Sequence, residues 1–153
     1  SLLDSGLEAG DIAALGVVNQ RSTAIAWESG SGEALHPALG WQDTRTSARV
    51  AELVALGIPV NTLASCTKFE WMLQNVSTIR EAGESHRLQL GTPDVWLTSQ
   101  LTGGEVFVTD MGNAGCTGLL DAGSRSWFPL ALDLFGIAEQ WLPSLVPSSA
   151  VVG

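Results

Sequence analysis

Apolar runs alternate with polar, glycine-rich breaks along the chain, and the first run is the most informative. Residues 12–18 have the length and the Val and Ile content of a strand that is covered on both faces. The run ends at Asn19, Gln20 and Arg21, whose side chains are rich in hydrogen-bond donors. Ligands of open α/β sheets bind near strand ends, so this corner is a candidate binding site. A solvated strand exit is the alternative interpretation.

The rest of the pattern predicts a mixed α/β domain. Residues 23–28 and 34–39 are expected to pair as a hairpin around the turn-forming segment 29–33. Helical spacing of apolar residues, together with Pro and Gly at the expected ends, predicts further elements. We expect helices around 50–57, 67–76, 77–83, 92–101 and 130–135, strands over 88–90 and 106–108, local structure over 119–121 and 125–127, and a loop of small residues over 111–117.

Composition narrows the classes of partner. A chain of 153 residues with 45% hydrophobic residues suits one domain with a sizeable core. The net charge of -9, with Lys68 as the single lysine, disfavours nucleic acid and anionic membranes. No apolar run approaches the roughly 20 residues of a membrane span. Ser1 takes the place of an initiator Met, and no basic leader follows, so we expect a processed product or a piece of a longer chain.

Motifs for metal, nucleotide or triad chemistry are missing from the sequence. Cys66 and Cys116 lie far apart without a CxxC pattern, which favours small buried thiols of a reducing compartment over a disulfide. His36 and His86 have no metal-ligand spacing, so no metal site is expected. Neither GxxxxGK[ST] nor GxGxxG is present, and nothing groups Ser, His and Asp into a triad.

A series of segments in a fixed order carries a family resemblance. Residues 16–23 are similar to the stretch Gly-Ile-Thr-Asn-Gln-Arg-Glu-Thr, and residues 38–46 to Ile-Val-Trp-Gln-Asp-x-Arg-Thr. Residues 65–75 contain a Lys and, three positions later, a Trp before a polar pair, and residues 109–117 are similar to Thr-Asp-x-x-Asn-Ala-Ser-x-Thr. Together with residues 91–104, this order resembles the FGGY family of carbohydrate kinases, and the glycerol kinase branch most closely.

The resemblance implies an actin- or hexokinase-type fold, with two ribonuclease H-like lobes around a cleft. Residues 11–147 would form an incomplete first lobe that binds substrate, with a mixed sheet and flanking helices. Residues 1–10 would be a linker or helix end, and residues 148–153 the start of a connection to an ATP-binding lobe. The family's opening strands, with their Asp-x-Gly-Thr loop, have no counterpart here, and its catalytic Asp lies beyond Gly153. The piece alone is therefore expected to be inactive.

The resemblance also implies substrate contacts at Arg21, Ser22 and Trp41. An Arg-Glu pair holds polyol hydroxyls in glycerol kinases; Arg21 matches the Arg, and Ser22 replaces the Glu. Trp41 matches an aromatic wall, and Leu63 aligns with a Tyr. Since a neutral serine cannot accept the charge-assisted hydrogen bonds of a carboxylate, we expect a sugar or polyol other than glycerol. Arg21 could instead pair with an acid, and Trp41 could serve packing.

Other family positions have plainer interpretations. Lys68 and Trp71 are expected to be structural, with Trp71 facing a second neighbour or a partly exposed site. Asp43 and Arg45 are expected to form a local pair before a helix. Asp110 and Asn113 could either line the cleft or cap a loop.

The function implied is transfer of the γ-phosphoryl group of ATP, with Mg²⁺, to a hydroxyl of a small sugar or polyol in the cytoplasm. No cofactor or metal is expected to bind tightly to this piece. The alternative is a catalytically silent sugar-binding or scaffold module. If the opening strands are missing, an unpaired edge or apolar face would be exposed, and we therefore expect self-association as a homo-oligomer.

Overall fold

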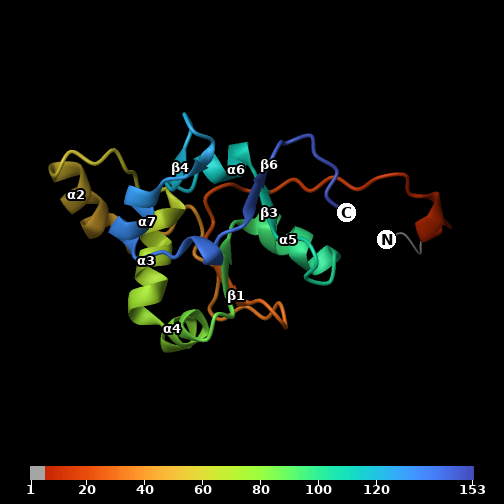
Figure 1. Cartoon of the computed structure of the whole chain (residues 1–153), viewed down its shortest axis with the longest axis horizontal. Helices are drawn as coiled ribbons and strands as arrows, with labels where there is room; N and C mark the ends of the chain where they lie inside the picture. Colours follow the sequence, from red (N-terminus) through yellow and green to blue (C-terminus); the bar gives the residue numbers. More distant parts are fainter. Residues whose placement is uncertain (1–5) are drawn as a thin grey trace.

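The computed structural model describes residues 6–153, which fold as a mixed α/β unit (Figure 1). The helices α2, α3, α4 and α7 gather on one side of the β1–β2 pair, and α5, α6, β3 and β6 lie on the other. The helices are α2 (Ser47–Ala55), α3 (Ser65–Asn75), α4 (Ser77–Glu84), α5 (Pro93–Leu101), α6 (Met111–Gly115) and α7 (Pro129–Phe135), with the short 3-10 helices η1 (Ala9–Asp11) and η2 (Glu139–Trp141). The strands are β1 (Ile25–Glu28), β2 (Leu88–Gly91), β3 (Val108–Asp110), β4 (Leu120–Asp121), β5 (Ser126–Trp127) and β6 (Ser144–Val146).

The described strands pair as three two-stranded sheets. β1 and β2 are antiparallel, β3 and β6 are parallel, and β4 and β5 form a small antiparallel pair. The hairpin expected between 23–28 and 34–39 forms, although it is held only by isolated bridges from Ala24 to Leu39 and from Trp27 to Ala34. The main partner of β1 is β2, which comes about sixty residues later and which the local pattern did not indicate.

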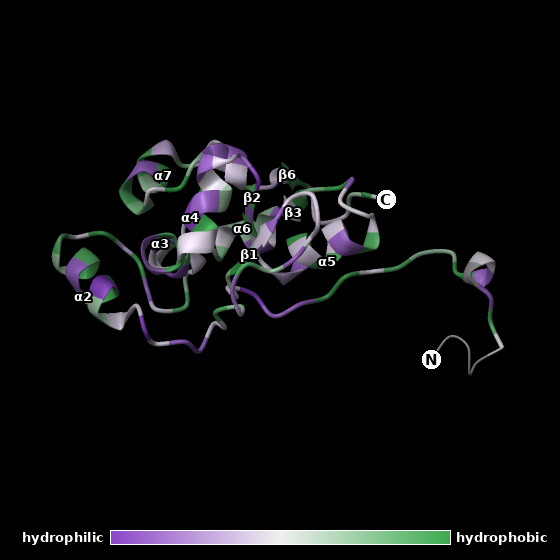
Figure 2. Cartoon of the chain, turned by 90° about the horizontal axis from the view of Figure 1, so that it is seen from below, coloured by the Kyte–Doolittle hydropathy of each residue, from purple (hydrophilic) through white to green (hydrophobic). Residues whose placement is uncertain are grey.

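The prediction of a buried strand over residues 12–18 is wrong. The segment is extended but is not paired with any strand of the described chain, and apart from the half-buried Val17 its apolar side chains are exposed, with Leu15 at 69% and Val18 at 94%. Figures 1 and 2 show this stretch as an arm that leaves the body of the molecule. A strand needs hydrogen-bonding partners as well as a suitable composition, and none of residues 6–153 supplies them.

The prediction of a loop over residues 111–117 is wrong for its first five residues, which form α6, and only residues 116–117 lie in a turn. The carboxylate of Asp110 accepts a hydrogen bond from the backbone N–H of Asn113 at 2.8 Å, which is an N-cap interaction. This cap satisfies a free donor of the first turn and stabilises a helix in a sequence of small residues. β3 likewise begins at Val108 rather than Val106.

The other predicted helices form close to the residues at which the apolar spacing placed them. α3 begins at Ser65, two residues earlier than expected, and α5 has Pro93 in its first turn. α7 ends at Gly136, whose φ of 65° lies in the left-handed region that favours glycine at helix ends. No helix of residues 6–153 is long and apolar enough to cross a bilayer.

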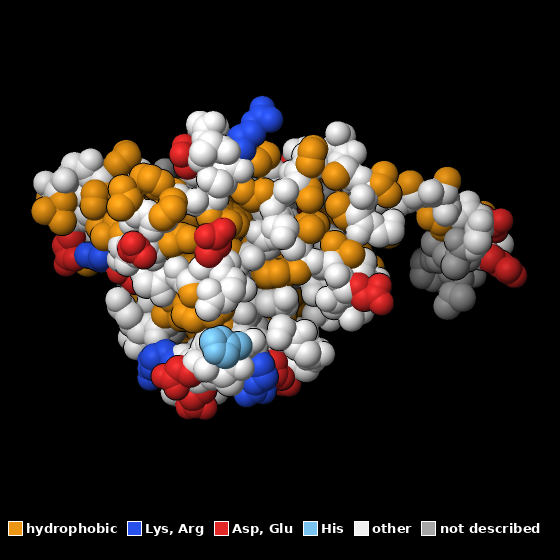
Figure 3. All heavy atoms as spheres, in the orientation of Figure 1, with side chains coloured by type: hydrophobic (Ala, Val, Ile, Leu, Met, Phe, Trp, Pro, Cys, Tyr) orange, Lys and Arg blue, Asp and Glu red, His pale blue; other side chains and the backbone are white. Residues whose placement is uncertain are grey.

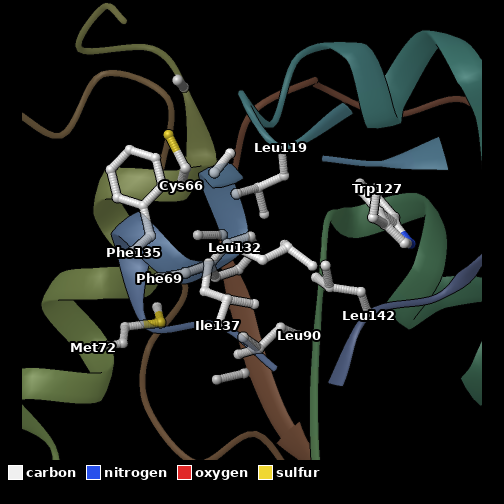
Figure 4. Packing of buried hydrophobic residues seen from close by; sticks show 14 of the residues in the cluster. Cys66, Phe69, Met72, Leu90, Leu119, Trp127, Leu132, Phe135, Ile137 and Leu142 are labelled. Atoms are coloured by element: carbon white, nitrogen blue, oxygen red, sulfur yellow. The ribbon is translucent and has the colours of Figure 1, made fainter. Parts of the chain in front are cut away.

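The main core lies where α3 and α7 meet the β1–β2 pair (Figure 4). Phe69 and Met72 of α3 are fully buried, and Leu132 and Phe135 of α7 pack toward them. A smaller cluster surrounds Trp27, whose ring meets Phe107 edge to face at 5.8 Å between centroids. Burial of these large side chains provides the main favourable contribution to folding.

The two cysteines are free thiols in different environments. Cys66 is fully buried in the main core, and burial raises the pKa of its thiol to about 12. Cys116 is only half-buried, which differs from the expected buried position.

Lys68 is fully buried at the start of α3. Its Nζ donates to the carbonyl oxygens of Thr62, Leu63 and Ala64 at 2.9, 3.0 and 3.2 Å. Burial lowers the pKa of the ammonium group, whereas the three carbonyls satisfy all three of its donors. The expectation of a structural lysine is confirmed, and the residue joins α3 to the loop before it.

Gly91 gives a sharp test of packing between β2 and α5. A Cβ at this position would lie 2.8 Å from Cβ of Val95 and 2.9 Å from the ring of Trp27. We expect Gly91→Ala to lower the free energy of unfolding by about 1–3 kcal/mol through overpacking. In urea unfolding followed by tryptophan fluorescence, the control Gly30→Ala, whose Cβ meets nothing within 4 Å, should change stability by under about 0.5 kcal/mol. Equal effects would contradict this account.

Lys68→Met keeps most of the length of the side chain but removes its donors. Because three carbonyls that are buried or partly buried lose their partner, we expect a loss of at least about 2 kcal/mol in the free energy of unfolding. Arg87→Met is the matched control, because Arg87 pairs with Glu28 at the exposed surface and should contribute under about 1 kcal/mol. A Lys68→Met protein as stable as the control would show that this cation is not structural.

Candidate functional site

A cavity of about 290 Å³ opens at the end of the arm, where the chain turns into β1. It is lined by residues from four distant parts of the sequence: Gln20 to Ser22, Trp41, Leu63 and Cys116. The structure thus brings Arg21, Ser22 and Trp41 to one place. Leu63, the position at which the resemblance places a Tyr, lies on the same wall.

Arg21 is exposed at the cavity, and its guanidinium has no hydrogen bond or ion pair with residues 6–153. The alternative of a salt bridge to a neighbouring acid is therefore not what the described chain shows. Its neighbour Gln20 is engaged, because Nε2 donates to Oγ1 of Thr23 at 2.9 Å and holds the turn. Arg21 is left as a group with five donors that faces the cavity.

Ser22 occupies a constrained corner. It has a φ of 67°, in the left-handed region, and it is buried. Its Oγ donates to the carbonyl oxygen of Cys116 at 3.4 Å, a long hydrogen bond. The hydroxyl therefore lies between an internal carbonyl and the cavity, where it can still accept from a ligand.

Trp41 forms the opposite wall and is 41% exposed. A tryptophan that serves packing alone is usually more deeply buried, so this exposure fits a surface for the carbon face of a ligand. The turn after it is fixed by Asp43, whose Oδ1 accepts from Nε of Arg45 at 2.9 Å. The hydrogen bond from Arg45 lowers the pKa of Asp43, and the expected local pair before α2 is confirmed.

Trp71 lies elsewhere on the surface. The guanidinium carbon of Arg45 sits 4.4 Å above its ring, and the ring of His36 is 5.9 Å away. Trp71 is half-buried, as expected for a residue off the core stripe of α3. These contacts make it a structural neighbour of the Asp43–Arg45 turn.

The remaining wall is held by hydrogen bonds between the backbone and the side chains of Asn61 and Lys68. The carboxamide oxygen of Asn61 accepts from the N–H groups of Leu63 and Ala64 at 2.9 and 3.2 Å, and Lys68 holds their carbonyls. Cys116 was not singled out as a wall residue from the sequence. Its only signal was its place within the 109–117 family segment, because local patterns do not show which distant loops meet.

Asp110 and Asn113 belong to a capping network rather than to the cavity wall. Oδ1 of Asp110 accepts from N and from Nδ2 of Asn113, both at 2.8 Å, and Ser148 donates to its Oδ2. Nδ2 of Asn19 donates to Oδ1 of Asn113 at 3.2 Å, which attaches the arm. Burial acts to raise the pKa of Asp110, but these hydrogen bonds outweigh it, so the pKa is lowered. The capping interpretation is the one that the geometry supports.

The cavity combines a cationic, a hydroxyl and an aromatic side chain. A cationic donor, a hydroxyl and an aromatic face can bind hydroxyls and the carbon face of a small molecule. Within residues 6–153, no group of three His, Cys, Asp or Glu side chains is placed to hold a metal ion.

Comparisons with known proteins agree with this fold. The model of the FGGY family of carbohydrate kinases, N-terminal domain, matches residues 2–153. A glycerol kinase from Polaromonas sp. is 39% identical over 97% of this chain and 32% of its own length, and glycerol kinase 1 from Pseudomonas aeruginosa is 40% identical over 100% and 33%. The chain therefore spans about a third of the length of these relatives.

Solved structures show the same architecture. The Plasmodium falciparum glycerol kinase with ADP superposes with a TM-score of 0.80 at 31% identity, over 85% of this chain and 28% of that one. A Brucella ovis xylulose kinase gives a TM-score of 0.68 at 29% identity, over 83% of this chain and 26% of that one. The expected α/β lobe of the actin type is confirmed. Since the family model covers nearly the whole sequence, this chain belongs to the FGGY family of carbohydrate kinases and is an N-terminal domain of that family.

Proposed function

We propose that this chain is the substrate-binding part of an ATP-dependent sugar or polyol kinase. The observation that carries the proposal is the meeting of Arg21, Ser22 and Trp41 in one cavity, at positions that the family resemblance associates with the polyol. Residues 11–147 would bind substrate, and residues 148–153 would lead to the part that binds ATP. A cytoplasmic homo-oligomer is part of the same proposal.

Arg21 and Trp41 would orient the substrate. The guanidinium can donate to two hydroxyl oxygens at once, and the indole face can cover the C–H groups between them. Holding the hydroxyl in place is a large part of the catalysis of phosphoryl transfer, which depends on positioning and on stabilisation of charge.

The substrate would differ from glycerol. Ser22 offers a neutral hydroxyl where a carboxylate would bind two substrate hydroxyls, and Leu63 offers no hydroxyl where a tyrosine would. Two polar contacts are thus weaker or lost, whereas the cationic and aromatic contacts are kept. These positions favour a larger sugar or polyol.

The nucleotide would bind elsewhere in the whole protein. The described residues contain no group of three His, Cys, Asp or Glu side chains that could hold a metal ion by itself, and we assign the nucleotide with its Mg²⁺ to the remainder of the protein. In the reaction, a substrate oxygen forms a bond to the γ-phosphorus, the bond from that phosphorus to the β-γ bridging oxygen breaks, and ADP leaves. The hydroxyl proton passes to a base that we assign to the remainder of the protein.

Phosphorylation of a panel of polyols, ketoses and aldoses by the full-length protein, with ATP and Mg²⁺, tests the proposal. We expect ADP release with at least one compound, and Arg21→Ala should raise KM for it by about 10–100-fold through loss of a charged hydrogen bond. The control Arg87→Ala removes an exposed arginine outside the cavity and should leave KM unchanged. Binding without phosphorylation across the panel would favour the silent sugar-binding module instead.

A gain-of-function test addresses specificity. The double change Ser22→Glu with Leu63→Tyr restores the two groups that the resemblance places in glycerol kinases. Relative to Ser22→Gln with Leu63→Phe, which adds similar volume without the carboxylate and the hydroxyl, we expect glycerol to bind at least about tenfold tighter. Calorimetric titration of the full-length variants measures this ratio. Equal binding of glycerol by the two double variants would show that these positions do not set specificity.

A further inference from the structure

A second and larger groove, of about 820 Å³, adjoins the polyol cavity. Its sides are the loop after α2, the end of α6 and the helix α7. Apart from Ser22, Asn61 and Cys116, the side chains of its described lining are aliphatic or aromatic, and none is charged. Figure 3 shows hydrophobic side chains gathered over the loop after α2 and beside α7. A hollow of this volume with a mostly apolar lining is typical of a small-molecule binding site.

The groove and the polyol cavity share part of their walls. Ser22, Leu63 and Cys116 line both of them. Two of these are small side chains, and the third, Leu63, is half exposed along the boundary. A molecule whose hydroxyls meet Arg21 can therefore continue past Ser22 and Leu63 into the groove.

Polar and apolar groups are separated along this path. Arg21 and Gln20 lie on the cavity alone, and Leu130, Leu134 and Phe128 lie on the groove alone. The one carboxamide in the groove, Asn61, uses its oxygen to accept from the N–H groups of Leu63 and Ala64. The groove therefore has few free hydrogen-bonding groups for further substrate hydroxyls, and its lining favours a hydrocarbon group.

The boundary is rigid. The backbone of Leu63 is held on both sides, because its N–H donates to Asn61 and its carbonyl accepts from Lys68. On the facing wall, the N–H of Cys66 donates to the carbonyl of Thr117 at 2.8 Å, and a Cβ on Gly118 would lie 2.8 Å from Sγ of Cys66. Both sides of the groove are thus fixed to α3 and are formed before a ligand arrives, as is usual for small-molecule sites.

We propose that the groove is a second part of the substrate site and that the substrate is a polyol or sugar with a hydrocarbon substituent. The hydroxyl-bearing end binds at Arg21, Ser22 and Trp41, and the hydrocarbon lies along Leu63 toward Leu130. This inference rests on the proposed function, because it takes the small cavity as the polyol pocket. A second copy of the chain in the groove is a competing outcome of the test.

Matched ligand pairs test the proposal on the full-length protein. Calorimetric titration compares glycerol with 1-O-hexylglycerol and glucose with n-hexyl β-glucoside, and n-hexanol shows the effect of the hydrocarbon alone. We expect at least one hexyl compound to bind about tenfold or more tighter than its parent, since each buried methylene adds to affinity. n-Hexanol alone should bind more weakly than that hexyl compound, because it lacks the contacts to Arg21.

Two exposed leucines serve as a matched pair of variants. Leu130 lines the groove and is 70% exposed, whereas Leu101 lies outside it and is 61% exposed. We expect Leu130→Gln to reduce the hexyl advantage about threefold or more, and Leu101→Gln to leave it unchanged. Because both side chains are largely exposed, neither change should prevent folding.

The other outcomes overturn the inference. Equal affinity of parent and hexyl compounds, or an advantage that Leu130→Gln leaves intact, excludes the groove as a subsite. An oligomer that Leu130→Gln dissociates in light scattering, with no change in the hexyl advantage, assigns the groove to a second copy. Phosphorylation of parent compounds without a hexyl advantage rejects this inference alone, whereas a hexyl advantage without ADP release rejects only the kinase. No binding of either member of any pair, together with no ADP release across the panel of polyols, ketoses and aldoses, rejects both.

Discussion

The ammonium group of Lys68 lies inside the protein, and the geometry of the site depends on how it is satisfied. A buried charge without partners is costly, so the carbonyls of Thr62, Leu63 and Ala64 must turn toward it. That requirement sets the path of the loop before α3. The same loop forms one wall of both the polyol cavity and the apolar groove, so a single interior cation shapes a surface that it does not itself touch.

α3 joins the two sides of the site through its first turn. Lys68 holds the loop of Leu63 on one side, and the N–H of Cys66 holds Thr117 on the other. The lack of a side chain at Gly118 lets that second loop approach the Cys66 thiol closely. Leu63 and Cys116, one from each loop, line both the polyol cavity and the apolar groove. The polar donors therefore lie on one side of these two residues, and the apolar surface lies on the other.

The arm, residues 12–18, is not held to the body of the molecule in the way that these two loops are held to α3. Residues 12–18 are apolar and extended, yet all of them except the half-buried Val17 are exposed, and Asn19 attaches their end to the Asp110 cap through Asn113. The Asp110 network thus performs two structural tasks, since it begins α6 and receives both the arm and Ser148. Arg21 follows directly after this anchor, so its place at the cavity depends on a contact between residues about ninety positions apart.

Local chemistry in the sequence was enough to predict most helices, the turn after β1, the pair of Asp43 and Arg45, and a structural role for Lys68. Helical periodicity, prolines and glycines act over a few residues, so they can be interpreted without knowledge of the fold. The order of family segments also predicted the lobe and the joint position of Arg21, Ser22 and Trp41. Only the tertiary structure decided that residues 12–18 are unpaired, that Asp110 caps a helix, and that Cys116 joins the two cavities. Each of these depends on which distant backbone groups meet, and a one-dimensional pattern does not contain that information.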